Sequence, residues 1–347
     1  MKRRFEYKDA KSDKYWEIEL NGKSYTTWYG RTGSKPRSDV NSFSSDTEAQ
    51  KEYDRLVREK VRKGYKEVTV ISEVNVTQAA YNQKDNQVNN TFKIIKEFSP
   101  WADEIKSTVK TFVKIELNGK PKNLWSSKVG SVPYLPLNYE YPVKGKLPLL
   151  FLAQINFKEV PALEGFPDKG ILQFYIGDDD LYGLNLKDHC KSNFRVLYFP
   201  DVIEDKTKLI NDFSFLKKLR NSPLDEGFTA AMKFTLDMEV VPPFDFRFEK
   251  LLPQLCVVMN DDDDLSDLYY EEVADSSGHK IGGYPMFTQE DPRGYKPLKG
   301  MGYELLFQLD VDKHLMFGDS GVCNFFILPD DLKLLDFTRV LYNWDCC

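Results

Sequence analysis

Four residues in one short stretch of the chain are suited to contacts with phosphate groups. The segment TTWYGRTGSKPR, residues 26–37, contains Tyr29, Arg31, Lys35 and Arg37. An arginine can donate two parallel hydrogen bonds to one phosphate, and a lysine adds a mobile point charge. A tyrosine ring can stack on a sugar or a base. The combination indicates either a surface that contacts an anionic partner or a structural hairpin with solvated cations.

Polar residues also recur within apolar strands of the C-terminal part. Three short segments return in the same order at nearly one spacing: KVGSVP at 128–133 and KIGGYP at 280–285, LAQIN at 152–156 and LFQLD at 306–310, GILQFYI at 170–176 and GVCNFFI at 321–327. Such self-similarity indicates an internal duplication. We therefore expect two related halves, each with a glycine turn followed by two strands.

The duplication places a lysine and a glutamine in each half. A glutamine inside a buried strand needs hydrogen-bond partners for its amide. One interpretation is that each glutamine ties the two repeats together through backbone groups. The other is a ligand cleft at the pseudo-twofold axis, lined by Lys128, Gln154, Lys280, Gln308 and Asp310.

Charge is distributed unevenly along the chain. The formal net charge is −6, yet residues 1–70 contain 17 Lys and Arg against 12 Asp and Glu. The strongest acidic segment, NDDDDLSDLYYEE at 260–272, has no glycine at the sixth position of a calcium loop that starts at Asp261. The split predicts an anionic partner for the N-terminal part and a basic protein partner for the remainder.

No other pattern points to catalysis or a cofactor. The chain contains no HExxH, CxxC or GxSxG, and its five cysteines have no framework spacing. We expect no metal and no cofactor. The N-terminus carries charges without an apolar segment, and no apolar run approaches the length of a membrane span. We expect a cytoplasmic protein that does not contact membranes.

A small sheet and one helix must position the phosphate-contacting residues. KYWEIEL at 14–20 alternates in polarity, Asn21-Gly22 favours a hairpin turn, and KSYTTWYGR returns as the second strand. Ser45 and Glu48 form a capping box that begins a helix with one apolar stripe. This pattern predicts an antiparallel sheet with one covering helix.

The remaining chain predicts a linker and a larger domain. Residues 71–92 are rich in Asn and Gln and indicate a flexible linker. The strands beyond are apolar on both faces, as in a buried sheet. We therefore predict an α+β protein with a small domain at 1–70, the linker at 71–92 and a strand-rich, duplicated α+β domain at 93–347.

The N-terminal motifs resemble the WGR domain, which occurs in poly(ADP-ribose) polymerases and many bacterial proteins. The resemblance rests on YGRTG, the YWEIEL-NG hairpin and the helix TEAQKEYDRLVREKVRKGY, over residues 1–70. The motif tryptophan aligns with Tyr29, whereas Trp28 is one residue earlier, on the other face of the strand. The resemblance implies that Tyr29, Arg31, Lys35 and Arg37 contact DNA or RNA ends or backbone.

The remainder resembles the YwqG-like family, a bacterial domain of unknown function. Six segments agree in order over residues 93–347: SKVGSVPYLP, FLAQINF, LEGFPDKGILQFYIGDDDLYG, KIGGYPMFTQEDPR, GDSGVCNFFILPDDL and DFTRVLYNWDCC. The resemblance implies no catalytic activity. Some members lie near polymorphic toxin genes, which implies an immunity role by association.

These observations favour a binding or adaptor protein over an enzyme. The basic module is expected to contact nucleic acid, and the acidic domain a protein or a small ligand. The first alternative is an immunity protein that neutralises a toxin through the acidic domain. The second alternative is an enzyme of unknown reaction in the cleft between the repeats.

Overall fold

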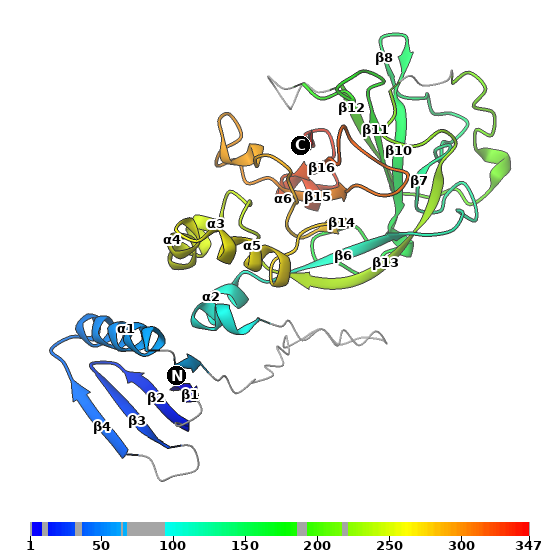
Figure 1. Cartoon of the computed structure of the whole chain (residues 1–347). Coiled ribbons are helices and arrows are strands. Elements are labelled where there is room, and N and C mark those ends of the chain that lie inside the picture. Colours follow the sequence, from blue (N-terminus) through cyan, green and yellow to red (C-terminus); the bar gives the residue numbers. More distant parts are fainter. Residues whose placement is uncertain are drawn as a thin grey trace. The chain divides into compact units, whose positions relative to one another are not determined.

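The computed structural model describes residues 2–8, 13–31, 37–63, 65–67, 94–185, 193–216 and 221–346 (Figure 1). The chain separates into one unit at residues 1–75 and another at 76–347, and each is described by itself. The expected linker at 71–92 lies outside the described residues.

The small unit is an antiparallel sheet with helix α1 (Asp46–Arg62) across one face (Figure 1). The strand order is β4-β3-β2-β1-β5. The strands are β1 (Lys2–Lys8), β2 (Asp13–Asn21), β3 (Ser24–Arg31), β4 (Arg37–Ser42) and β5 (Lys66–Glu67). The Ser45 hydroxyl accepts from the Glu48 N–H at 3.2 Å and so caps the helix. Alternate strand residues, among them Phe5, Trp16 and Ile18, pack with Tyr53 of the helix.

The large unit is built around one ten-stranded sheet. Its order is β12-β11-β10-β7-β13-β6-β14-β15-β16-β17, and each neighbouring pair is antiparallel. The strands are β6 (Lys110–Leu117), β7 (Lys128–Gly130), β10 (Leu150–Asn156), β11 (Ile171–Ile176), β12 (Phe194–Phe199), β13 (Thr229–Glu239), β14 (His279–Gly282), β15 (Glu304–Leu309), β16 (Val322–Ile327) and β17 (Leu341–Asp345). A separate ribbon pairs β8 (Val143–Lys144) with β9 (Leu147–Pro148).

Counted inward from either edge, each half of the sheet follows the same order of connected strands, β12-β11-β10-β7 on one side and β17-β16-β15-β14 on the other. This confirms the predicted duplication. Strands β7, β10 and β11 of the first half correspond to β14, β15 and β16 of the second. The register also shifts at matching places, between Phe151 and Ala153 in one half and between Leu305 and Phe307 in the other. The α+β fold class predicted from sequence is confirmed.

The two halves exchange their first strands. In chain order β6 precedes β7 and β13 precedes β14, but β6 pairs with β14 and β13 pairs with β7. Strands β6 and β13 pair with each other at the centre, where Glu116 lies opposite Lys233. Each half therefore needs a strand from the other, so we expect the two halves to fold together.

The sheet curves until its two ends meet. The ring of Phe174 in β11 lies 4.6 Å from that of Phe307 in β15 and 4.7 Å from that of Phe325 in β16, measured between centroids. The edge strands also touch through Phe194 and Tyr342, whose centroids are 5.4 Å apart. One apolar core therefore fills the inside of a nearly closed barrel.

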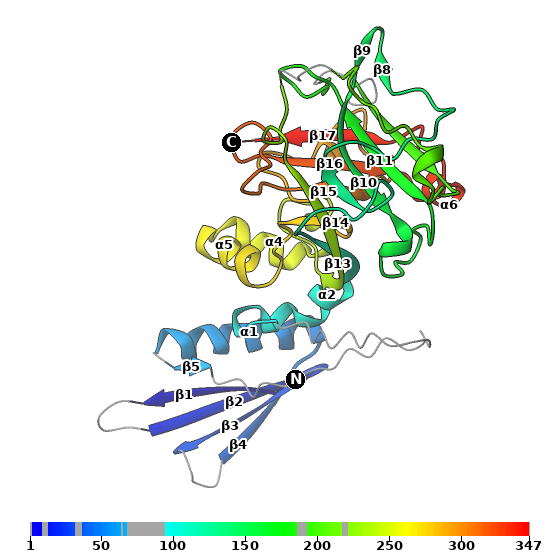
Figure 2. The same ribbon diagram turned by 90° about the vertical axis from the view of Figure 1, so that its right-hand side faces the viewer.

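The helices of the large unit cover one part of its outer surface. Helices α3, α4 and α5 lie together beside β6, β13 and β14 (Figures 1 and 2). The helices are α2 (Ala102–Ser107), α3 (Phe248–Leu251), α4 (Pro253–Asn260), α5 (Asp263–Glu272) and α6 (Pro329–Leu334). Leu255, Met259 and Tyr269 form a second buried cluster there with Phe98 and Ile105.

Candidate functional site

The register of three neighbouring strands brings cationic positions to one end of the small sheet. Lys14 of β2 is paired with Arg31 of β3, and Tyr29 of β3 with Arg37 of β4. Paired residues of this kind have Cβ atoms about 5 Å apart. We call Lys14, Tyr29, Arg31 and Arg37 the basic corner.

The structure describes part of the predicted phosphate-contacting set. Lys35 and the side chain of Arg31 lie outside the described residues. Arg37 and Lys14 are exposed, and neither forms an ion pair with any side chain that the structure describes. Lys14 was missed in the sequence, because the observed turn is Gly22-Lys23 rather than the expected Asn21-Gly22, which shifts the register of the two strands by two residues.

The two aromatic residues of the motif occupy different faces of β3. Tyr29 is half-buried and packs against the core beneath α1, while its neighbour Trp28 points to the opposite face. The Tyr29 hydroxyl donates to Asp39 Oδ2 at 2.9 Å. This hydrogen bond and the charge of Asp39 raise the pKa of Tyr29, whereas the charge of Arg37 lowers it. Tyr29 therefore shares the environment of Arg37.

In the first half of the large unit, Gln154 holds the segment before the glycine turn. Its Oε1 accepts from the Tyr134 N–H at 2.8 Å. Its Nε2 donates to the carbonyls of Leu124 and Ser126, each at 2.8 Å. The side chain is fully buried, these three bonds go to backbone groups, and Oε1 also accepts from Gln173 Nε2 at 3.1 Å.

In the second half, Gln308 makes the corresponding contacts. Its Oε1 accepts from the Met286 N–H at 2.8 Å, and its Nε2 donates to the carbonyls of Ser276 at 3.0 Å and Gly278 at 2.8 Å. The Asp310 carboxylate accepts from the Gly278 N–H at 2.6 Å. Both glutamines therefore order the turn that precedes the next strand of their own half.

The predicted cleft residues come together as two pairs. Lys128 is the register partner of Gln154, and Lys280 is the register partner of Gln308. Because β13 and β6 lie between β7 and β14, the two lysine-bearing strands are about 14 Å apart across the sheet. The register also offsets Lys128 from Lys280 by four residues along β13. Among the described residues we find the pairs separate, so a shared cleft stays a prediction.

Lys280 forms a buried ion pair. Its Nζ lies 2.7 Å from Glu239 Oε2 and donates to the Tyr284 carbonyl at 2.9 Å. Glu239 also accepts from the Tyr284 N–H. Gly283, at φ +79°, leaves the space that this carboxylate occupies, because a Cβ there would lie 2.0 Å from Glu239 Oε1. The turn, the lysine and the carboxylate form one unit.

Lys128 has the same place in the first half without such a partner. It is 2% exposed, and its Nζ donates to the Leu124 carbonyl at 3.0 Å. No carboxylate pairs with it among the side chains described. Burial lowers the pKa of Lys128 to about 8, against the opposing charge of Glu159.

Two D-x-R turns in the second half were missed in the sequence. In DFR at 245–247 the Asp245 carboxylate accepts from the Arg247 backbone N–H at 3.0 Å and from its Nε at 2.7 Å. In DPR at 291–293 Asp291 accepts from the Arg293 N–H at 3.0 Å and from its Nε at 2.9 Å. The repeated D-x-R spacing was a usable signal. We call these segments the twin turns.

A network of charged side chains joins the twin turns to the sheet. Arg293 Nη2 lies 2.9 Å from Asp245 Oδ2, and Arg247 Nη1 lies 2.6 Å from Glu304 Oε1. Lys110 Nζ lies 2.7 Å from the other oxygen of Glu304. Burial alone would raise the pKa of Asp245, but hydrogen bonds from Arg247 and the charges of both arginines hold it at about 2. Asp245 is therefore ionised at neutral pH.

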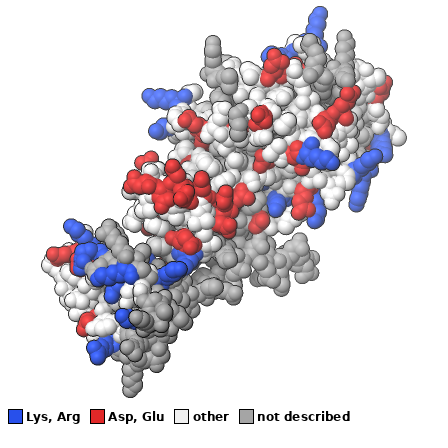
Figure 3. Space-filling view, in the orientation of Figure 1, with Lys and Arg blue, Asp and Glu red and all other residues white. Residues whose placement is uncertain are grey.

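The acidic segment lies on the outer surface. Figure 3 shows acidic side chains gathered over α4 and α5. The exposed carboxylates are Asp261, Asp262, Asp263, Asp264, Asp267, Glu271 and Glu272. Helix α4 also exposes Val257 at 64% and Val258 at 39%. Apolar groups beside carboxylates are suited to an amphipathic basic partner.

Two searches of the described residues give negative results. No group of three or more His, Cys, Asp and Glu side chains there is arranged to hold a metal ion. None of the helices described is both long and apolar enough to cross a membrane.

Family models match both parts of the chain. The model of the domain of unknown function DUF1963 matches residues 127–346. The chain belongs to this family. The WGR domain matches residues 1–70. Both resemblances seen in the sequence, a WGR domain and a domain of unknown function after it, are confirmed.

Individual relatives match over short lengths. The chain is 39% identical over 67 residues to the uncharacterized protein YfeS of Escherichia coli K12, which is 19% of this chain and 28% of YfeS. It is 40% identical over 65 residues to protein YehF of the same organism, 19% of this chain and 24% of YehF. The match thus spans about a quarter of each curated relative. A crystal structure of a Bacteroides fragilis protein matches at 40% identity over 20% of each chain, with a TM-score of 0.20.

Proposed function

We propose that this protein is a binding protein whose WGR domain contacts the phosphate backbone or the end of a nucleic acid. The WGR domain is a nucleic-acid-binding module. The observation that carries the proposal for this chain is the basic corner, where three adjacent strands contribute Lys14, Arg31 and Arg37. Lys35, which follows Arg31 in the sequence and lies outside the described residues, adds a fourth cation.

The chemistry of the basic corner suits phosphate better than base recognition. Arginine forks pair with phosphate oxygens, and Tyr29 offers a ring edge beside Arg37. Three or four such contacts give weak binding with a salt slope of about −0.9 for each phosphate neutralised in duplex DNA. We therefore expect binding to fall steeply between low and physiological salt.

Fluorescence anisotropy of the full chain tests this proposal. The probes are blunt duplex, nicked duplex, single-stranded DNA and RNA, each at low and physiological salt. Arg31→Ala with Arg37→Ala should weaken binding and reduce the duplex salt slope by about two. The matched control, Lys23→Ala with Lys51→Ala, removes the same charge away from the corner. Equal losses of nucleic-acid affinity in both double variants would mean that overall charge, and not the basic corner, causes the binding.

For the DUF1963 domain we propose a basic protein partner, bound by the acidic surface of α4 and α5. The observation in its favour is that exposed Val257 and Val258 lie beside the carboxylates of α5. Carboxylates speed association with a basic partner, and apolar contacts slow its release. In the immunity form of the proposal this partner is a toxin.

The identity of the neighbouring gene distinguishes an immunity protein from an adaptor that binds another basic protein. A toxin-like reading frame beside this gene favours the immunity form, and co-expression should then restore growth. Asp263→Lys with Asp264→Lys should abolish that rescue, whereas Asp201→Lys with Asp168→Lys, away from α5, should preserve it. Rescue that survives the first pair would exclude this surface.

A further inference from the structure

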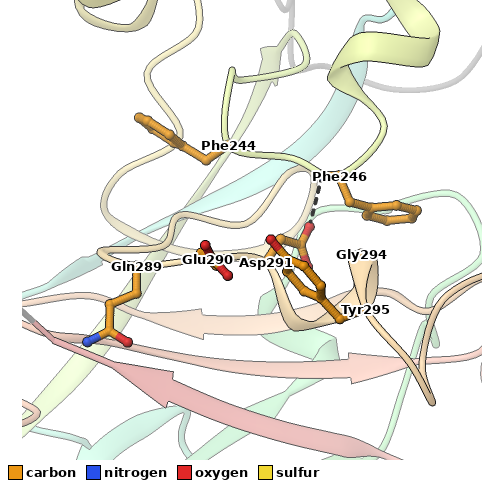
Figure 4. A pocket seen from close by; sticks show the side chains of 7 residues that line it. All are labelled: Phe244, Phe246, Gln289, Glu290, Asp291, Gly294 and Tyr295. Atoms are coloured by element: carbon orange, nitrogen blue, oxygen red, sulfur yellow. Dashed lines mark hydrogen bonds between the residues drawn. The ribbon is translucent and has the colours of Figure 1, made fainter.

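A pocket opens between the twin turns, on the outer surface of the second half of the DUF1963 domain. Its volume is about 340 Å³, within the range of small-ligand sites. Figure 4 shows the side chains that line it. They are Phe244 and Phe246 from around the first turn, and Gln289, Glu290, Asp291, Gly294 and Tyr295 from around the second.

The charge of the pocket wall is negative. Its only ionisable carboxyl groups are Glu290 and Asp291, and no lysine or arginine lines it. Both oxygens of Asp291 already accept hydrogen bonds from Arg293. Glu290 is exposed, and no ion pair to it occurs within the described part of the chain. Its carboxylate interacts with the Tyr295 hydroxyl and raises the pKa of Tyr295, which leaves the negative charge in place. Glu290 therefore has a charge available for a ligand.

Three aromatic side chains line the same pocket as this carboxylate, and Tyr295 lies beside it (Figure 4). Phe244 is 39% exposed and Tyr295 is 56% exposed, and both line the pocket. The Phe246 ring already lies 5.0 Å from the Arg293 guanidinium carbon and 5.2 Å from that of Arg247. Cation–π contacts thus already form on one ring of the wall. The Phe244 ring packs edge-on against Tyr270, with centroids 4.7 Å apart, and keeps its remaining exposed surface toward solvent, as does the Tyr295 ring.

The floor of the pocket is held in place by buried groups. The Asp345 carboxylate accepts from the N–H groups of Thr288 at 3.0 Å and Gln289 at 2.7 Å. The Gln289 amide donates to the Cys346 carbonyl at 2.7 Å. Asp291 also accepts from the Phe246 N–H at 3.2 Å, which joins the two walls. The pocket is therefore preformed rather than a gap between mobile loops.

We propose that this pocket binds an organic cation, the guanidinium or ammonium group of an arginine or lysine side chain or of a small amine. Glu290 forms the ion pair, and the rings of Phe244 and Tyr295 contact the faces and alkyl carbons of the cation. The negative wall disfavours phosphate, so this site has the opposite preference to the basic corner and stands independently of nucleic-acid binding.

Ligand-detected NMR with the full chain tests the proposal. The probes are arginine amide and lysine amide, each acetylated at its α-amine, with N-acetylnorleucine methylamide as a neutral compound of similar length. The cations should bind about tenfold more tightly than the neutral probe. A peptide with one central arginine separates the sources: tighter binding than arginine amide indicates a protein side chain, and equal binding indicates a small molecule.

Substitutions locate the binding. Glu290→Gln should weaken the binding of arginine amide about tenfold, and Tyr295→Leu should weaken it several-fold. Tyr295→Phe keeps the ring, so its affinity should stay within about threefold of wild type. Both residues are exposed, so we expect the variants to fold. The matched control is Glu271→Gln, which removes a carboxylate from α5. Equal binding of the neutral probe, no saturable binding of either cation, or an unchanged affinity in Glu290→Gln would overturn the proposal.

Discussion

The two halves of the DUF1963 domain share a backbone plan but differ in what covers it. Both use a buried glutamine to hold the turn before the second strand, with the same three backbone contacts. Lys280 faces Glu239 at 2.7 Å, whereas Lys128 faces a carbonyl. Both halves have the glutamine amide that orders the backbone, whereas within the described part of the chain only the second half places a buried carboxylate beside its lysine.

The buried charged groups and the pocket are concentrated in the second half. The second half carries the twin turns, the charged network, the aromatic pocket and the acidic helix α5. The first half covers the corresponding surface with an aromatic cluster around Tyr134, Phe199 and Phe213. A duplicated scaffold can keep one half for stability while the other gains a site. The predictions below test this division.

The largest expected effect comes from breaking the buried ion pair. Lys280→Met leaves Glu239 buried without its partner and should reduce the free energy of unfolding by about 3–5 kcal/mol. Urea unfolding measures this loss. Replacing both partners, with Lys280→Met and Glu239→Leu, should recover most of it. A loss below about 1 kcal/mol in the single variant would mean that the pair is dispensable.

The next effect tests what the halves share. Gln154→Leu and Gln308→Leu each leave one buried N–H and two carbonyls without that partner, so each should cost about 2–4 kcal/mol. Urea unfolding should give similar losses for both. A loss in only one half would show that the amide contact no longer has the same role in both.

The third effect sharpens the contrast between the lysines through pH. The folded chain releases the Lys128 proton near pH 8, while the unfolded chain holds it until about pH 10.4. Between these values the unfolded state binds more protons, so Lys128 makes the free energy of unfolding rise with pH, by up to about 3 kcal/mol. Lys128→Met should lack this rise and should not be less stable than wild type at pH 7. Parallel pH curves for the two proteins would contradict the assignment.

The smallest expected effect comes from the ion pair between the two central strands, β6 and β13. Glu116 and Lys233 pair at 3.3 Å, but their side chains are 52% and 67% exposed. Such a pair contributes about 0–1 kcal/mol because water screens it. Glu116→Gln should therefore change the urea midpoint little. A large change would mean that the exchanged strands depend on this contact.

Local patterns in the chain were enough to predict the small sheet, its covering helix and the duplication. Alternating polarity in KYWEIEL and the Asn21-Gly22 signal located the hairpin, but its two turn residues are Gly22 and Lys23. The pairing of Lys14 with Arg31 therefore came only from the structure. The recurrence of Lys128 and Gln154 as Lys280 and Gln308 located corresponding strands. The exchange of β6 and β13 was not predictable, because it depends on which distant strands pair.

The sequence by itself determined residue types, local turns and the repeat, since these follow from neighbours along the chain. Only the tertiary structure decided that Glu239 reaches Lys280, that the turns at Asp245 and Asp291 meet, and that a pocket opens between them. The physical reason is that these contacts join residues about forty or more positions apart. Their geometry is set by the curvature of the sheet and the packing of the helices beside it, which no local pattern encodes.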